Sequence, residues 1–159
     1  MNSRTPGLTL TRNGYREEVP RVDASTRSHD GRNLHMVYDS AFAEARDLSR
    51  LRAETTEALE RQDRTRDHVR VVGLLLSELA TNALMHASSP YRLTVELDDE
   101  ETLVNVSDAG AGEAFTRSPA EINGGYGLNL VNALASAWGA EPSAQGKSVW
   151  AAVGRDLDL

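Results

Sequence analysis

The sequence predicts an α+β two-layer sandwich, in which helices pack on one face of a mixed, mostly antiparallel β-sheet. Two segments, 42–59 and 65–87, repeat apolar residues at three- and four-residue steps, which is typical of amphipathic helices. Two further segments, 91–97 and 103–107, are separated by a short charged turn and predict an antiparallel hairpin. Helices that share a short chain with hairpins cover one side of a sheet, which gives this fold class.

The first 33 residues differ from the remainder of the chain. They contain six arginines and four acidic residues, with scattered Gly and Pro, and they show no sustained hydrophobic period. This composition predicts a mostly disordered tail over 1–33, because the segment offers too little apolar surface to offset the entropy of folding. We expect a solvated tail, with contact to an acidic partner as the alternative.

The predicted domain begins at residue 34. Residues 34–38 combine apolar and β-forming side chains and predict the first strand. Ser40 is expected to cap the first helix, whose apolar stripe runs from Phe42 to Leu59. The polar segment 61–67 then separates this helix from the next one.

The helix predicted over 65–87 has a buried face and a polar stripe. When Val72 is set to zero and each residue turns the helix by 100°, Glu78 and Asn82 fall together beside the apolar face. That apolar face is formed by Val72, Leu75, Leu76, Leu79 and Ala83. The two polar side chains are therefore expected to border the core without entering it.

The hairpin follows this helix. Residues 91–97 alternate strictly between apolar and polar side chains, which predicts a half-buried strand. The charged turn and the partner strand at 103–107 come next. The loop-like segment 109–123 is long for a compact domain, and long loops often form lids.

The remaining elements are a helix and a final hairpin. A third helix is expected to open at Gly124–Gly127 and to stop at Gly139. A turn at Gln145–Gly146 then leads into the last strand, 147–153. Residues 154–159 are expected to form a C-terminal tail after the domain over 34–153.

Composition excludes several functional classes. The chain has 159 residues and no cysteine, which excludes disulfides, thiolate metal sites and a cysteine nucleophile. Its net charge of −7 argues against general nucleic-acid binding. No apolar run approaches the ~18 residues of a membrane span, and no secretory signal is evident. We therefore expect a cytoplasmic protein that binds neither membranes nor nucleic acid directly.

Three polar motifs are candidates for chemistry. In the first, Glu78 and Asn82 are four residues apart on a helix, which brings their side chains to about 6 Å from each other. A carboxylate in such a position accepts a proton or orients a water, and an amide oxygen completes a Mg²⁺ shell. A solvated helix edge is the alternative interpretation of the pair.

The second motif, Asp108-Ala-Gly-Ala-Gly112, directly follows a predicted strand. A carboxylate at a strand end accepts a hydrogen bond from an exocyclic amine such as that of adenine, and the glycines let the backbone approach a flat ligand. An ordinary turn is the alternative. The third motif, Gly124-Gly-Tyr-Gly-Leu128, opens a helix, where free N–H groups favour a phosphate. It matches neither a P-loop nor a Rossmann fingerprint.

In this order and spacing, the motifs resemble those of the GHKL ATPase superfamily, which includes gyrase, Hsp90, histidine kinases and MutL. Glu78–His86 is similar to the N box, Asp108–Gly112 to the G1 box and Gly124–Leu128 to the G2 box. The resemblance covers roughly residues 34–153. It implies the Bergerat ATP-binding fold, with ATP and Mg²⁺ as cofactors.

Within that superfamily the chain most resembles the stand-alone anti-sigma factor serine/threonine kinases of actinomycetes. Ser77–Ala83, His86 and the ending Gly146–Trp150 carry this resemblance. It implies a protein kinase that phosphorylates a serine of a STAS-domain anti-anti-sigma protein and sequesters a sigma factor. It also implies a homodimer as an assembly to test.

The resemblance implies roles for single residues. Glu78 corresponds to the general base that accepts the serine proton, Asn82 to the Mg²⁺ ligand and Asp108 to the acceptor of the adenine amine. The positions that correspond to the adenine pocket, lid hinge and phosphate cradle are Gly110, Gly112, Gly124, Gly125, Tyr126, Gly127 and Leu128. His86 is expected to pack or cap the helix end, and Arg117 to be solvated.

One departure concerns the Gly-Thr that usually precedes the last strand and whose hydroxyl helps the adenine site. This chain has Gly146-Lys147-Ser148 there, and Ser148 is the candidate to supply the hydroxyl through a register shift. Two alternative functions therefore stay open. One is a catalytically weak or inactive partner-binding switch that regulates transcription. The other is a histidine-kinase type of domain that acts on a separate phosphoacceptor protein.

Overall fold

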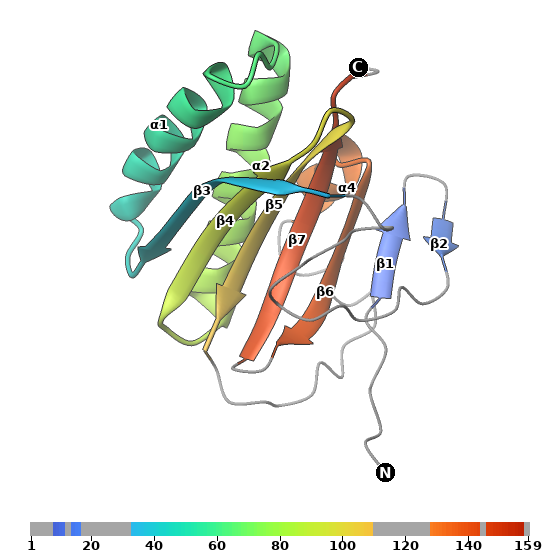
Figure 1. The fold of residues 1–159 in the computed structure, drawn as a ribbon. Helices are drawn as coiled ribbons and strands as arrows, with labels where there is room; N and C mark the ends of the chain where they lie inside the picture. The colour runs from blue at the N-terminus through green and yellow to red at the C-terminus, as the bar shows by residue number, and fades with distance from the viewer. Residues whose placement is uncertain (1–7, 12–13, 17–32, 110–127, 144–145, 158–159) are drawn as a thin grey trace.

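In the computed structural model the chain forms one sheet with helices on one of its faces (Figure 1). The structure describes residues 8–11, 14–16, 33–109, 128–143 and 146–157. The strands of these ranges are β1 (Leu8–Thr11), β2 (Gly14–Arg16), β3 (His35–Phe42), β4 (Tyr91–Leu97), β5 (Glu101–Asp108), β6 (Ala137–Ser143) and β7 (Gly146–Gly154). The helices are α1 (Asp47–Glu60), α2 (Arg66–His86) and α4 (Asn129–Leu134).

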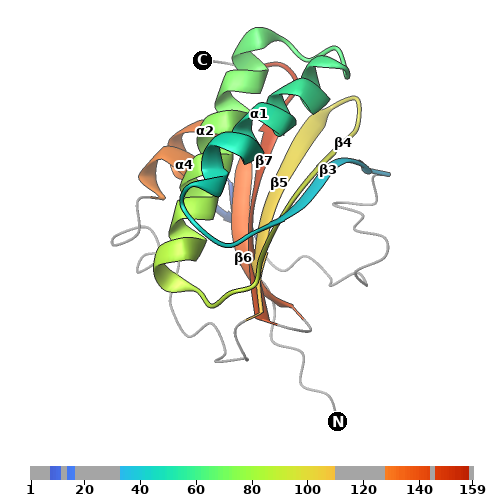
Figure 2. The same ribbon diagram turned by 90° about the vertical axis from the view of Figure 1, so that its left-hand side faces the viewer.

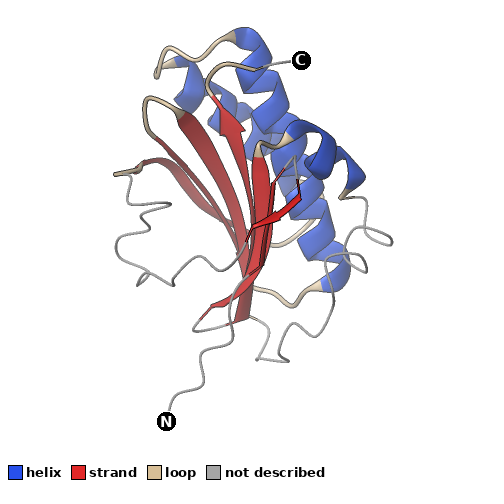
Figure 3. Ribbon diagram, turned by 90° about the vertical axis from the view of Figure 1, so that its right-hand side faces the viewer, coloured by secondary structure: helices blue, strands red, loops and turns tan. Residues whose placement is uncertain are grey.

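The sheet has seven strands in the order β2-β1-β6-β7-β5-β4-β3. Each neighbouring pair in this order is antiparallel. The helices lie together on one side of the sheet, as Figure 3 shows with helices in blue and strands in red. The predicted two-layer α+β sandwich is therefore confirmed.

The main hydrophobic core lies between α2 and the helix-covered face of the sheet (Figure 2). The stripe that the helical period predicts is buried and consists of Val72, Leu75, Leu76, Leu79 and Ala83. Strand side chains alternate between faces, so every second residue enters this core. These strand residues include Leu93, Val95, Leu97, Val104, Val106, Val149, Ala151 and Val153. Each fully buried Leu contributes about 1.5–3 kcal/mol relative to an exposed one.

The opposite face of the sheet carries a second, smaller cluster. It consists of Leu103, Trp150 and Ala152, with Leu34 and Ala137 packed against it. Residues 103 and 150 thus face away from α2, whereas Val104 and Val149, one position along each strand, face toward it. This alternation fixes the face on which each site residue of β5 and β7 lies.

Even α2, with 21 residues, lacks the apolar stretch of a bilayer-crossing helix, as do the other described helices.

The structure corrects the predicted start of the first helix. Ser40 and Phe42 belong to β3, because this strand pairs with β4 as far as Phe42 and Tyr91, whose rings stack with centroids 5.3 Å apart. The Ser40 hydroxyl accepts a hydrogen bond from Arg50 at 3.0 Å and caps nothing. Asp47 begins α1 and accepts from two preceding backbone N–H groups at 2.9 and 3.0 Å, which lowers the pKa of its carboxyl.

Strand pairing corrects one further expectation and adds two strands to the N-terminal segment. The third helix ends at Leu134, and Gly139 lies within β6 opposite Trp150. Within the segment expected to be a mostly disordered tail, residues 8–11 and 14–16 form β1 and β2, and β1 pairs with β6. In both places long-range backbone hydrogen bonds outweigh the local sequence signal.

A buried histidine ties α2 to the sheet. His68 is fully buried, and its Nδ1 lies 3.2 Å from the Gly154 carbonyl while its Nε2 lies 2.8 Å from the Thr102 hydroxyl. Because a carbonyl only accepts, Nδ1–H donates to Gly154 and Nε2 accepts from Thr102. Burial, with a further effect of the Arg64 charge, lowers the pKa of His68. The neutral ring therefore belongs to the folded state.

This geometry predicts that stability falls with acidification below about pH 6.5. The unfolded chain protonates His68 near its ordinary pKa, whereas the folded chain resists protonation, so the stabilisation is complete above that value and is lost as the pH falls. Thermal unfolding at about pH 7.5 and about pH 5.5 measures the effect. The difference in Tm should shrink in His68→Gln and persist in His86→Gln, which changes an exposed residue. An unchanged difference in His68→Gln would contradict this assignment.

Candidate functional site

The long helix α2 presents the first pair of candidate residues. The helix begins after Thr65, whose hydroxyl accepts a hydrogen bond from the His68 N–H at 3.2 Å. Further along this helix, the side chains of Glu78 and Asn82 are both half-buried. The apolar stripe beside them is buried. The structure thus places the pair at the border of the core, as the helical period predicts.

The Asn82 side chain has an unsatisfied oxygen. Its Oδ1 is buried and has no hydrogen-bond partner among the described residues. A buried polar atom without a partner costs about 1–3 kcal/mol, so its presence points to a ligand that completes it. An amide oxygen is a ligand type that Mg²⁺ accepts. Asn82 therefore fits the predicted role of a metal ligand.

Asp108 lies at the same end of the domain as this pair. It is the last residue of β5, it is only 7% exposed, and β4 pairs with it through Tyr91. The Tyr91 hydroxyl in turn donates to the carbonyl of Ala87, directly after α2, at 3.0 Å. These contacts bring the end of β5 beside the C-terminal half of α2. The helix pair and the buried carboxylate thus lie toward the same end of the domain, although they are distant in sequence.

Gly146, the first residue of β7, is a site residue whose role the motifs did not reveal. A Cβ at this position would lie 2.2 Å from the Asp108 carbonyl oxygen and 2.9 Å from its Oδ1. Only glycine permits this approach, so Gly146 lets the start of β7 pack against the backbone of Asp108. The sequence shows a glycine at the start of the last strand, but it does not show that this glycine contacts Asp108, because that contact depends on the pairing of β7 with β5.

The structure does not bring Ser148 to Asp108. β7 pairs Ser148 with Ser107, and by strand alternation both side chains lie on the face that carries Trp150, away from α2. Lys147, one position earlier, lies on the Asp108 face at the same end of the strand pair. A half-buried lysine therefore lies on the face where the Ser148 hydroxyl was expected.

The remaining candidates divide into two groups. Leu128 is 1% exposed and belongs to the main core at the start of α4, and His86 is exposed at the end of α2. Gly110, Gly112, Arg117, Gly124, Gly125, Tyr126 and Gly127 lie outside the described residues. Within the described ranges, no three His, Cys, Asp or Glu side chains gather as a metal-binding cluster.

Comparison with known proteins gives a family match. A family model described as the histidine kinase-like ATPase domain matches residues 42–153, well over half of the chain. The matched range begins at the end of β3 and contains α1, α2, α4 and the strands β4 to β7. It therefore includes Glu78, Asn82, Asp108 and Gly146. No curated protein matches the chain.

The close approach of Gly146 predicts a local defect in Gly146→Ala. The added Cβ pushes β7 away from the end of β5, which we expect to cost about 1–3 kcal/mol of stability and to displace the Asp108 carboxylate. Gly154→Ala at the other end of β7 is the matched control, because its Cβ would meet nothing closer than 3.8 Å. Thermal unfolding compares the two variants, and equal stability would contradict the close approach.

Proposed function

The chain belongs to the histidine kinase-like ATPase family, whose domains are ATP-binding and of the GHKL type, and from this premise we propose that it is an ATP-dependent protein serine/threonine kinase. Its substrate in this proposal is a serine of a STAS-domain anti-anti-sigma protein. Its second partner is a sigma factor, which it sequesters. The proposal places the protein in the cytoplasm and requires neither a membrane nor direct nucleic-acid contact; a homodimer is its proposed assembly.

One observation carries the catalytic part of the proposal. The unsatisfied Oδ1 of Asn82 lies one helical turn from the half-buried carboxylate of Glu78, at the domain end where Asp108 is buried. In the proposed mechanism Asn82 is the metal ligand, Glu78 the base and Asp108 the acceptor of the adenine amine, and catalysis consists mostly of positioning and charge neutralisation. If Asn82 and Glu78 had only a structural role, the Asn82 Oδ1 would not need to lack a hydrogen-bond partner.

Each group has a task that follows from its position. Asp108 accepts a hydrogen bond from the adenine amine, and Gly146 lets the start of β7 pack against its backbone. Asn82 would hold Mg²⁺, which when bound would supply positive charge against the phosphates. Glu78 takes the proton of the acceptor serine while the serine oxygen bonds to the γ-phosphorus and the bond to the β,γ-bridging oxygen breaks, which releases ADP.

A second function, a nucleotide-dependent partner-binding switch with little or no catalysis, is supported by Lys147. In this alternative the Lys147 ammonium, on the same face of the sheet as Asp108 by strand alternation, competes with the adenine amine for the carboxylate. That competition weakens nucleotide binding without removing the partner surface. The extent of ATP binding and of phosphotransfer distinguishes the switch from the kinase.

The Asn82 assignment predicts magnesium-dependent binding of ATP. Isothermal titration of the protein with ATP, with and without Mg²⁺, should show tighter binding with the ion. Asn82→Ala should weaken binding in Mg²⁺ by about tenfold or more, because the metal loses a ligand, and should leave magnesium-free binding unchanged.

Thr81→Ala is the matched control, because it removes an exposed polar side chain from the neighbouring position of α2. If ATP fails to bind at millimolar concentration, the kinase proposal is wrong and the protein is a nucleotide-independent partner module. If Asn82→Ala binds Mg-ATP as tightly as the parent, the metal assignment is wrong.

The Glu78 assignment predicts a variant that binds but does not transfer. Glu78→Gln preserves side-chain size and should lower the rate of phosphate transfer to a STAS-domain protein by about 10²–10⁴-fold, with ATP affinity unchanged. Asp67→Asn removes one exposed carboxylate from the same helix and should keep the parent rate. Acid-stable phosphoserine is the expected product; acid-labile phosphohistidine would identify the histidine-kinase alternative.

A further inference from the structure

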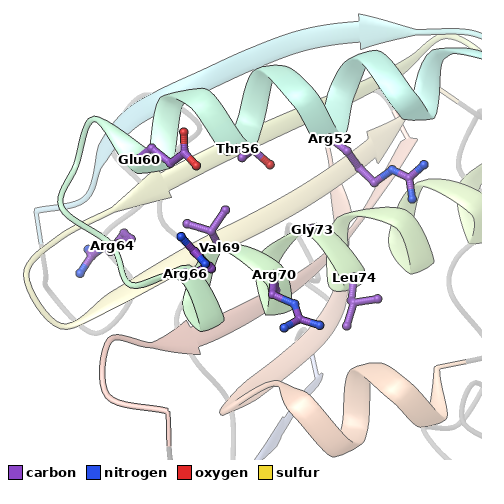
Figure 4. A pocket seen from close by; sticks show the side chains of 9 residues that line it. All are labelled: Arg52, Thr56, Glu60, Arg64, Arg66, Val69, Arg70, Gly73 and Leu74. Atoms are coloured by element: carbon purple, nitrogen blue, oxygen red, sulfur yellow. The ribbon is translucent and has the colours of Figure 1, made fainter.

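A groove of about 660 Å³ lies between α1 and α2, apart from the candidate ATP site. Figure 4 shows the side chains that line it. They are Arg52, Thr56 and Glu60 from α1, Arg64 from the connection, and Arg66, Val69, Arg70, Gly73 and Leu74 from α2. The volume falls in the range of ligand pockets, yet no described element occupies it.

The groove is elongated along two antiparallel helices. Its α1 side consists of Arg52, Thr56 and Glu60, which recur at four-residue steps. Its α2 side carries Arg66, Arg70 and Leu74 at the same spacing. Eight residues of helix rise by about 12 Å, which equals the length of roughly four residues of extended peptide. The dimensions therefore suit a segment of chain better than a single small anion.

The charge of the groove opposes that of the whole protein. Four arginines and one glutamate line it, in a chain whose net charge is −7. Among the described residues, none forms an ion pair or hydrogen bond with the side chains of Arg52, Arg66 or Arg70. Arg66 and Arg70 repel each other at this spacing, and Arg66 stands in the first helical turn, where the helix dipole disfavours cations. An anionic group bound in the groove would relieve this repulsion.

Arg64 provides an independent observation. The residue is only 8% exposed and lines the groove, and its Nη2 donates to the Asp98 carbonyl. Its Nε and Nη1 are buried and have no hydrogen-bond partner in the described part of the chain. Arg64 therefore contributes its positive charge to the wall of the groove, while its guanidinium is held inside by the Asp98 carbonyl.

The apolar lining indicates what else the partner carries. A Cβ at Gly73 would meet nothing within 4 Å, so the floor of the groove is open at a position where a helix ordinarily favours alanine. Beside it, Leu74 is 48% exposed although it is a large apolar side chain. Apolar contact at one end and guanidinium groups along the length fit a peptide of mixed acidic and apolar residues.

We propose that the groove between α1 and α2 binds an acidic segment of a protein partner, with its carboxylates on the arginines and an apolar side chain on Leu74. Leu74 precedes Glu78 by one helical turn, so a segment bound here runs toward the candidate base. That last consequence rests on the proposed function, whereas the binding itself does not.

Fluorescence anisotropy with a labelled eight-residue peptide, Glu-Glu-Leu-Glu-Glu-Leu-Glu-Glu, tests the proposal at low salt. The acidic protein repels such a probe in general, so saturable binding reports a local site. Arg66→Glu and Arg70→Glu should each weaken binding by about tenfold or more. Arg46→Glu makes the same charge change at an exposed residue outside the groove and should change binding by less than about twofold.

Three results would overturn the proposal. The first is that the peptide shows no saturable binding at millimolar protein. The second is that Arg70→Glu binds the peptide as tightly as the parent protein does. The third is that inorganic phosphate, at the concentration of the peptide, displaces it, because this would indicate a site for small anions. The variant Asn82→Ala should bind the peptide normally. A parent protein that binds the peptide but not ATP would contradict the kinase function alone, whereas a parent protein that binds ATP but not the peptide would contradict this site alone.

Discussion

The packing of α2 on the sheet is the constraint on which the other features depend. Its apolar stripe, from Val72 to Ala83, is buried against β5 and β7, and each successive residue turns the helix by 100°. If α2 were rotated by one residue, Glu78 would be buried and Leu79 exposed, and no local change would offset the free-energy cost. His68 adds a polar anchor to Thr102 and Gly154. Because rotation and depth of the helix are fixed, one row of residues at four-residue steps carries the groove arginines near the start of α2 and Glu78 and Asn82 near its end.

Sequence periodicity located the elements that are governed by local signals. The helix at 66–86 and the strand at 91–97 were predicted almost to the residue, because the apolar period, the Thr65 cap and the alternation all agree. The predictions failed where strand pairing decides. Ser40 has the side chain of a cap, and Gly139 has the backbone freedom of a helix terminator, yet β4 and β7 hold both in strands. Such pairing depends on residues about fifty and ten positions away in the chain.

The candidate site follows the same division. The spacing of Glu78 and Asn82 and the strand-end position of Asp108 are readable from the sequence, whereas the contact of Gly146 with Asp108 is not. The register of β7 decides whether Lys147 or Ser148 lies on the Asp108 face, and a single-residue difference reverses the answer. The groove was missed for a related reason. Arginines spaced along two helices look like an ordinary solvated surface until the helices are placed side by side.

The strand β1 has a consequence for how the protein behaves at high concentration. It pairs with β6 along four residues and leaves β2, only three residues long, at that border of the sheet. Short outermost strands offer few free N–H and C=O groups to another molecule. Removal of the segment that contains β1 would leave the seven-residue β6 unpaired along this side. Intermolecular strand addition and precipitation, rather than loss of ATP chemistry, would then be the first symptom of N-terminal truncation.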